Sequence, residues 1–277
     1  MPMRETRKQR EARLENRKFW WLLLLAMFLL AGIGGGFWWA RNQYEELDVA
    51  LCPKRSGPRA IHLVLIDHTD PISEQQRQGV HLWLDRQIEE AKIAGERFEL
   101  YTVEGDANRS QIPMLSVCSP GRGDDANRLY ENPDIIRKRF EREFVAPTRK
   151  AVDALLNAPA LPNSPILESI KASAISSFGR FDRGTLPLRI TIISNMIQNS
   201  PVLSHYRSEP NFREFSRTPA WLTVQANLKG AQVFVVYLLH PREMRSGRPI
   251  QNRGHQQLFW EPAIGASNGQ IMSFDQL

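Results

Sequence analysis

Apolar residues are distributed in two different patterns along the chain. Near the N-terminus, residues 19–40 form one run without a charged side chain. Beyond residue 59, short apolar runs alternate with segments in which apolar residues recur every three or four positions. The first pattern predicts one membrane-spanning helix, and the second predicts buried strands that alternate with amphipathic helices.

The long run, FWWLLLLAMFLLAGIGGGFWWA, contains 22 residues. As a helix it would span about 33 Å, which is enough to cross a hydrocarbon core of roughly 30 Å. Aromatic residues at both ends, Phe19–Trp21 and Phe37–Trp39, match the preference of indole rings for the headgroup region. No small-x-small cleavage pattern follows the run, so we expect an uncleaved signal anchor.

Positive charge is concentrated before this run. Residues 1–18 contain seven Lys and Arg residues, whereas residues 41–60 contain four. Because cations resist translocation, we expect a cytoplasmic N-terminus and an extracytoplasmic domain, which in a Gram-negative bacterium would be periplasmic. Residues 1–40 carry a net charge of +4 (seven cations and three acids), which leaves +2 of the chain's +6 for the remainder. This remainder is not basic enough to predict a nucleic-acid partner.

The later apolar runs have the length of strands that are buried on both faces. They are Ala60–Ile66, Phe98–Val103, Leu188–Ile193 and Gln232–Leu239, the last clear strand. A helical pattern joins the first two runs, and it opens at Ser73 with Gln76 in the capping-box position. Buried strands that alternate with helices predict an α/β domain with a doubly wound, mostly parallel, Rossmann-like sheet.

The other expected elements are less regular. We expect a short strand at Pro113–Val117, a helix that opens at Asn132 and is interrupted at Pro147, and later helices at Pro219–Leu228 and Gln256–Ile264. The expected organisation is a basic cytoplasmic tail (1–18), a transmembrane helix (19–40), a linker (41–59) and one α/β domain (60–277).

Ligands of open parallel sheets bind beyond the carboxyl ends of the strands, so the polar residues at these ends are the candidates for function. One group runs from Asp67 to Ser73, a second is the loop Pro162–Pro165, and a third is Ser194–Met196. Each also has an ordinary structural explanation, because Ser and Asp are common helix caps and turn residues.

At this point the chain resembles a von Willebrand factor A domain from about Ala60 to its C-terminus. In that family, an Asp-x-Ser-x-Ser motif, a loop hydroxyl and a later Asp form a metal-ion-dependent adhesion site. Asp67 and Thr69 match the first two motif positions, Ser164 matches the loop hydroxyl, and Asn195 stands where the later Asp is expected. The third motif position is Pro71, which cannot bind a metal through its side chain.

The resemblance implies a site for Mg²⁺ or another divalent cation at Asp67, Thr69, Ser164 and Asn195, with Asp70 and Ser73 as substitute ligands. It also implies an adhesion-type binding module, without catalytic residues, that is anchored in the membrane and docks a protein partner through the strand ends.

Two other functions remain open. Isochorismatase-like cysteine hydrolases also begin with a strand that ends in Asp, so Asp67 and Cys118 could be catalytic, although no counterpart of that family's lysine is evident. Alternatively, Gly32 and Gly36 have the G-x-x-x-G spacing of helix pairs, which would suit a structural subunit that acts through its transmembrane helix. In an oxidising compartment, Cys118 could instead pair with Cys52, although two buried thiols fit the sequence equally well.

Overall fold

The computed structural model describes residues 7–43, 46–91, 94–104, 111–124, 126, 132–179, 186–207, 209–240 and 242–277. The chain divides into two compact units, Met1–Glu46 and Leu47–Leu277. Part of the expected basic tail, residues 1–6, lies outside the described residues.

The first unit contains one long helix, α1 (Arg7–Gln43). Its segment Asn16–Trp39 is long and apolar enough to cross a membrane, and none of it is buried in the protein. A core helix of a soluble domain would be covered by other elements, whereas the apolar surface of this segment is exposed, as in a candidate membrane-spanning helix. Gly32 and Gly36 lie on this exposed surface with no neighbouring atom near their missing Cβ positions.

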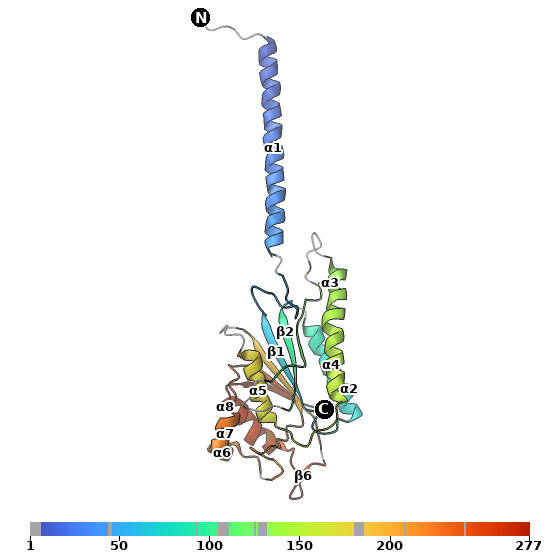
Figure 1. Ribbon diagram of the computed structural model, residues 1–277, viewed down its shortest axis with the longest axis vertical. Coiled ribbons are helices and arrows are strands. Elements are labelled where there is room, and N and C mark those ends of the chain that lie inside the picture. The colour runs from blue at the N-terminus through green and yellow to red at the C-terminus, as the bar shows by residue number, and fades with distance from the viewer. Residues whose placement is uncertain are drawn as a thin grey trace. The chain divides into compact units, whose positions relative to one another are not determined.

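A six-stranded sheet forms the centre of the second unit (Figure 1). Its strand order is β3-β2-β1-β4-β5-β8, and every neighbouring pair is parallel except β3, which runs antiparallel to β2. The strands are β1 (Ala60–Ile66), β2 (Glu96–Thr102), β3 (Leu115–Cys118), β4 (Leu188–Ser194), β5 (Gln232–Tyr237) and β8 (Gln270–Gln276). The expected mostly parallel α/β fold is therefore confirmed.

Helices cover both faces of the sheet (Figure 1). One face carries α5 (Ile166–Phe178), α6 (Phe212–Phe215), α7 (Pro219–Val224), the π-helix η2 (His255–Trp260) and α8 (Glu261–Ala266). The other carries α2 (Glu74–Glu90), α3 (Pro133–Phe140), the π-helix η1 (Glu141–Val145) and α4 (Ala146–Leu156). Alternate residues of β1 reach the two cores, since Leu63 and Leu65 pack on the first face and Val64 and Ile66 on the second.

The helix that was expected to break at Pro147 is instead continuous from α3 through η1 to α4. Pro147 lies in the first turn of α4, directly after the π-helix, where the Ala146 N–H bonds back to the Glu141 carbonyl. Because proline has no N–H to donate, the irregular turn accommodates it without ending the helix.

Several other boundaries differ from the expectation. The expected strand at Pro113–Val117 is β3, and the helix expected to reach Leu228 ends at Val224. A sixth strand, β8, follows α8 at the sheet edge, and a two-stranded hairpin joins β6 (Met244–Arg245) to β7 (Arg248–Pro249). Most of β8 is partly or fully exposed, which explains why its sequence lacks the apolar run of a buried strand.

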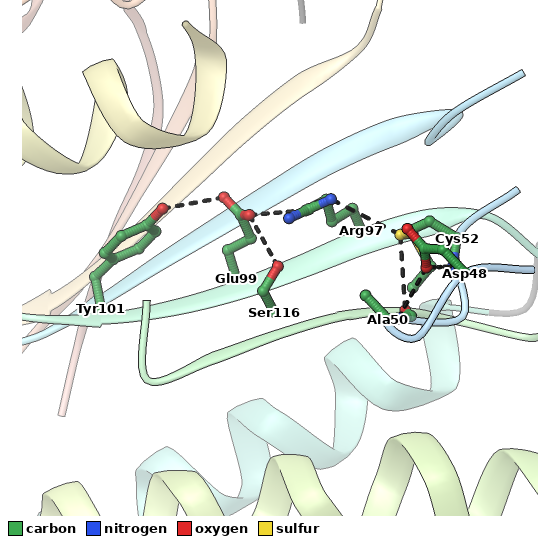
Figure 2. Close-up of polar contacts among 8 residues, drawn as sticks. Asp48, Ala50, Cys52, Arg97, Glu99, Tyr101 and Ser116 are labelled. Atoms are coloured by element: carbon green, nitrogen blue, oxygen red, sulfur yellow. Dashed lines mark hydrogen bonds and ion pairs between the residues drawn. A yellow bond between two sulfur atoms is a disulfide. The ribbon is translucent and has the colours of Figure 1, made fainter. Parts of the chain in front are cut away.

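The segment at residues 47–59, which was expected to be a linker, belongs to the compact second unit. A turn docks on β3, where the Cys118 N–H donates to the Ala50 carbonyl at 2.7 Å and the Asp48 carboxylate accepts from the Cys52 N–H at 2.8 Å (Figure 2). Cys52 and Cys118 form a disulfide with their Cα atoms 4.9 Å apart. The disulfide prediction is thus confirmed, and it ties the start of the domain to an edge strand.

A buried ion pair lies beside this disulfide, on β2 (Figure 2). The Glu99 side chain is fully buried and accepts from Arg97 Nε at 2.7 Å, from Ser116 Oγ at 3.0 Å and from Tyr101 Oη at 3.2 Å. Three donors on one carboxylate satisfy a charge that would otherwise be costly to bury.

Candidate functional site

The candidate site lies at the carboxyl ends of β1 and β4. These parallel strands are neighbours in the centre of the sheet, and the strand order reverses between them. Asp67 follows β1, and Ser194 is the last residue of β4. This position is the topological switch point at which open α/β sheets bind their ligands.

Asp67 is the centre of a hydrogen-bond network. One carboxylate oxygen accepts from the Thr69 N–H at 3.0 Å and from the Thr69 hydroxyl at 2.6 Å. The other accepts from the Ser194 hydroxyl at 2.6 Å and from the Ser164 hydroxyl at 3.1 Å. All four residues are buried, so these donors replace the water that would otherwise solvate the charge.

Ser164 reaches Asp67 from a loop far away in the sequence. It forms a two-way backbone bridge with Asn199, in which each N–H donates to the other residue's carbonyl at 2.9 Å. This bridge joins the loop before α5 to residues 195–207, which we call the 195–207 loop. The structure therefore brings together three of the predicted site residues: Asp67, Thr69 and Ser164.

Asn195 is committed to other contacts. Its Nδ2 donates to the Asp70 carboxylate at 2.6 Å, and its Oδ1 accepts from the Ile197 N–H at 2.8 Å. Its backbone carbonyl accepts from Gln251 Nε2 at 2.9 Å. The side-chain oxygen predicted as a ligand is thus used to shape the 195–207 loop, in which Met196 has a φ of 58°.

Ser73 lies in the cap of α2 and not in the site. Its hydroxyl accepts from the Gln76 N–H at 3.2 Å, and the Gln76 side chain accepts from the Ser73 N–H at 3.0 Å. This is the capping box that the sequence predicted. His68, the histidine nearest the site in sequence, is also buried, and its Nδ1 lies 3.1 Å from the Pro159 carbonyl.

A small polar pocket of about 160 Å³ opens beside this network. It is lined by Thr69, Asp70, Leu161, Pro162, Asn163, Ser164, Ile197, Asn199 and Tyr206. Burial raises the pKa of the Tyr206 phenol, and Asp70 and Glu243 raise it further, so Tyr206 remains a hydrogen-bond donor. A larger hollow of about 380 Å³ lies between α2 and β8, and it shares no lining residue with the pocket beside Asp67.

The oxygen donors of this pocket match a hard cation in kind. Thr69 and Ser164, which carry hydroxyls, and Asp70, which carries a carboxylate, line it, and such cations prefer oxygen ligands. Asp67 lies behind the hydroxyls and already accepts four hydrogen bonds. Within the part of the chain that the structure describes, no three His, Cys, Asp or Glu side chains are grouped to hold a metal. The site thus offers neutral ligands and one carboxylate at its surface.

The pair needed by a cysteine hydrolase is not assembled. Cys118 pairs with Arg97 at the start of β2, whereas Asp67 follows Ile66, which pairs with Thr102 at the end of that strand. Arg97 and Thr102 are five residues apart along β2, so Cys118 and Asp67 lie roughly 17 Å apart in the strand direction. The Cys118 sulfur is also bonded to Cys52.

Two residues of the site were not among the predicted ligands. Ser194 belongs to the predicted strand-end group Ser194–Met196, but Asn195 was the ligand chosen from that group. Tyr206 lies in an irregular loop with no periodic pattern, and nothing in the sequence places it beside Asp70.

The fold and site define an α/β domain with a mostly parallel sheet and a polar switch-point pocket, in a chain whose described residues include one candidate membrane helix. No protein-family model matches the chain, and no curated protein matches it either. A solved structure that matches is that of an aerotolerance-related membrane protein from Bacteroides fragilis NCTC 9343 with multiple mutations to serines. The alignment has 12% identity and a TM-score of 0.38, and it covers 78% of this chain and 92% of the other. At these values the likeness carries no argument about function.

Proposed function

We propose that this chain is a membrane-anchored docking protein. Its second unit would be a von Willebrand factor A-like domain that binds a protein partner through the strand-end site, which consists of Asp67, Thr69, Asp70, Ser164 and Tyr206. The observation that carries the proposal is the set of polar side chains from three separate segments, gathered around one carboxylate at the switch point.

The pocket suits binding better than catalysis. The described residues that line it include no histidine, lysine or cysteine that could activate the hydroxyl of Thr69 or Ser164. Its hydroxyls from Thr69 and Ser164 donate to Asp67, which fixes their orientation. A small, open hollow with fixed polar groups fits one side chain of a partner surface.

A divalent cation such as Mg²⁺ would be held by Thr69, Ser164 and Asp70, and it would supply positive charge for an acidic group of the partner. Without a cation, the same donors and carboxylate would contact the partner directly. Chelation by EDTA separates these two modes.

We further propose that the domain lies outside the cytoplasm. The excess of cations before the membrane helix supports this orientation. The disulfide also supports it, because such bonds persist in oxidising compartments.

Photo-crosslinking from the pocket rim tests the proposal. A photoreactive amino acid would replace Asn163, which is exposed at the pocket, or Asn227, an exposed asparagine at the opposite ends of the parallel strands. We expect crosslinks to a partner in native membranes from position 163 and none from position 227. Equal crosslinking from both positions would contradict a docking site at the strand ends.

A charge variant provides the matched comparison. Asp70→Asn keeps an acceptor for Asn195 but removes the charge at the pocket, whereas Asp134→Asn removes an equal charge on exposed α3. We expect the crosslink from position 163 to weaken at least several-fold in Asp70→Asn and to persist in Asp134→Asn. If EDTA weakens the crosslink from position 163 in the chain that keeps Asp70, docking depends on a cation.

A further inference from the structure

Behind the strand-end site, three buried aromatic side chains form a hydrogen-bonded chain. The Tyr237 hydroxyl lies 2.9 Å from His255 Nδ1, and His255 Nε2 lies 2.9 Å from His205 Nδ1. Tyr237, His255 and His205 are 1%, 2% and 0% exposed. They join the end of β5 and the π-helix η2 to the 195–207 loop.

The neighbouring donors fix how the protons are arranged. The Gln198 N–H donates to His205 Nδ1 at 3.3 Å, so this nitrogen is an acceptor and the His205 proton is on Nε2. His255 must then donate from its Nε2 to His205 and accept from Tyr237 at its Nδ1. Trp260 Nε1 donates to the Met196 carbonyl at 2.8 Å, and its contact with His255 Nε2 at 3.3 Å is the longer and weaker of the two. Both imidazoles are therefore neutral.

The surroundings of His205 and His255 disfavour a second proton on either imidazole ring. Burial lowers the pKa of His205, and the His255 and Arg245 charges lower it further. Burial and Arg245 lower the pKa of His255 to about 4, against a small opposing effect of the Met196 carbonyl. From β6, Arg245 donates to the His205 carbonyl, and its own carboxylate partner is the exposed Glu209. His205 Nε2 has no hydrogen-bond partner among the described residues.

Acidic groups reach the pair only indirectly. On α5, Glu168 accepts from Gln198 Nε2 at 2.9 Å, and Gln198 is the residue that contacts His205. The other neighbours that touch the rings are Phe259 and Trp260 of η2. Among the described residues, an imidazolium at this place would thus gain no carboxylate contact in the closed structure.

The 195–207 loop depends on neutral His205. The backbone N–H of His205 donates to the Gln198 carbonyl at 2.9 Å, and the ring nitrogen Nδ1 of His205 accepts from the backbone N–H of Gln198. Between these residues, Asn199 forms the bridges to Ser164 and Ser204. The next residue, Tyr206, lines the pocket. Loss of the contact between His205 and Gln198 would therefore remove one wall of the pocket.

We infer that the His205–His255 pair is an acid-sensitive control of the strand-end site, in which protonation opens the 195–207 loop and dismantles the pocket. Its regulatory meaning rests on the proposed docking function. The inference rests on the hydrogen-bond chain, on the His205 Nε2 without a hydrogen-bond partner among the described residues, and on the 195–207 loop, which contains both His205 and the pocket residue Tyr206.

The expected size of the effect follows from proton linkage. In the open loop both rings contact water and titrate near pH 6.5, whereas in the closed loop both stay neutral. Each histidine then favours opening by a factor of about ten between pH 7.5 and pH 5.5. Two histidines together raise the open fraction about a hundredfold.

Hydrogen exchange of the full chain in detergent micelles tests this inference without a partner. Protection of peptides from the 195–207 loop would be compared at pH 7.5 and pH 5.5, after correction for the intrinsic exchange rate, with that of β1 and β4. We expect protection of the loop to fall about a hundredfold while that of the two strands changes little. Unchanged loop protection, or an equal fall in the strands, would overturn the inference, because the second result means global unfolding.

Two variants assign the effect to the pair. His205→Asn keeps an acceptor near the Nδ1 position but does not titrate. The fall in loop protection between pH 7.5 and pH 5.5 should therefore shrink to about tenfold. The control His81→Asn removes a half-exposed histidine of α2 and should keep the hundredfold fall. A hundredfold fall in His205→Asn would refute the assignment. If that variant is unfolded at pH 7.5, His255→Gln with Tyr237→Phe replaces it, with the same expectation. A positive exchange result with no crosslink from position 163 would reject the docking function and retain the acid-sensitive loop.

Discussion

Asp67 should contribute to the stability of the fold more than to binding. Replacement by alanine removes the acceptor of two buried hydroxyls, those of Ser164 and Ser194, which lie at 3.1 and 2.6 Å. Both hydroxyls come from other segments of the chain, and each buried donor without an acceptor costs about 1–3 kcal/mol. Thr69 also loses the acceptor for its N–H. We therefore expect Asp67→Ala to lower the free energy of unfolding by about 3–5 kcal/mol.

The asparagine variant separates charge from hydrogen bonding. In Asp67→Asn, Oδ1 can still accept from both Thr69 donors, while the amide nitrogen faces Ser164 and Ser194. Hydroxyls can rotate to accept, although Ser194 Oγ already accepts from the Met196 N–H at 2.7 Å. The expected loss is about 1–2 kcal/mol.

The assay is urea-induced unfolding of the detergent-solubilised chain, followed by near-ultraviolet circular dichroism. A lower midpoint at an unchanged slope would report a change in stability alone. A double-mutant cycle with Ser194→Ala should give a coupling energy of about 1–2 kcal/mol. A cost below about 1 kcal/mol for Asp67→Ala, or no coupling to Ser194, would refute the structural role.

Three further predictions concern the whole domain. The double variant Cys52→Ser, Cys118→Ser opens a loop of 66 residues and should lower the free energy of unfolding by about 4 kcal/mol. An unchanged midpoint in urea would show that the disulfide does not stabilise the domain. Burial holds the pKa of His62 at about 3, so below pH 6.5 the unfolded chain binds a proton that the folded chain does not. His62→Gln, which can keep the contact with Thr191, should therefore recover about 3 kcal/mol of stability at pH 4.5 but not at pH 7.5. A reporter enzyme that works only outside the cytoplasm, fused after Leu277, should be active, and activity of a cytoplasmic reporter alone would reverse the orientation.

The fold was predictable where burial is complete. The runs Ala60–Ile66 and Leu188–Ile193 are apolar because β1 and β4 have neighbours on both edges and helices on both faces. β8 was missed because it has a neighbour on one edge only and exposes alternate side chains, so its sequence is as polar as a loop. The α3–α4 helix was split because proline signals a break locally, whereas the π-helix that precedes Pro147 has no local sequence signal.

The site was predictable to the extent that strand ends determine it. Asp67 and Thr69 follow a recognisable strand, and Ser164 lies in the loop that precedes α5. The partners within the site were not predictable, because hydrogen bonds depend on side-chain direction. Asn195 had the right position in the sequence, but its amide faces Asp70 and Ile197, while Ser194, one residue earlier, faces Asp67. Adjacent residues at the end of a strand point in opposite directions, so an error of one position exchanges the residue in the site for its neighbour.

The geometry divides the site into two layers with separable roles. Asp67 and Ser194 form an inner layer that is buried and has its side-chain oxygens bonded within the protein. Asp70 and Tyr206 form an outer layer that lines the pocket and carries its charge and its phenolic donor. A partner touches the outer layer, so changes there should alter affinity with little effect on folding, and changes in the inner layer should do the reverse. Thr69 and Ser164 belong to both, since their hydroxyls donate to Asp67 while the two residues line the pocket, and they are the positions at which stability and binding should change together.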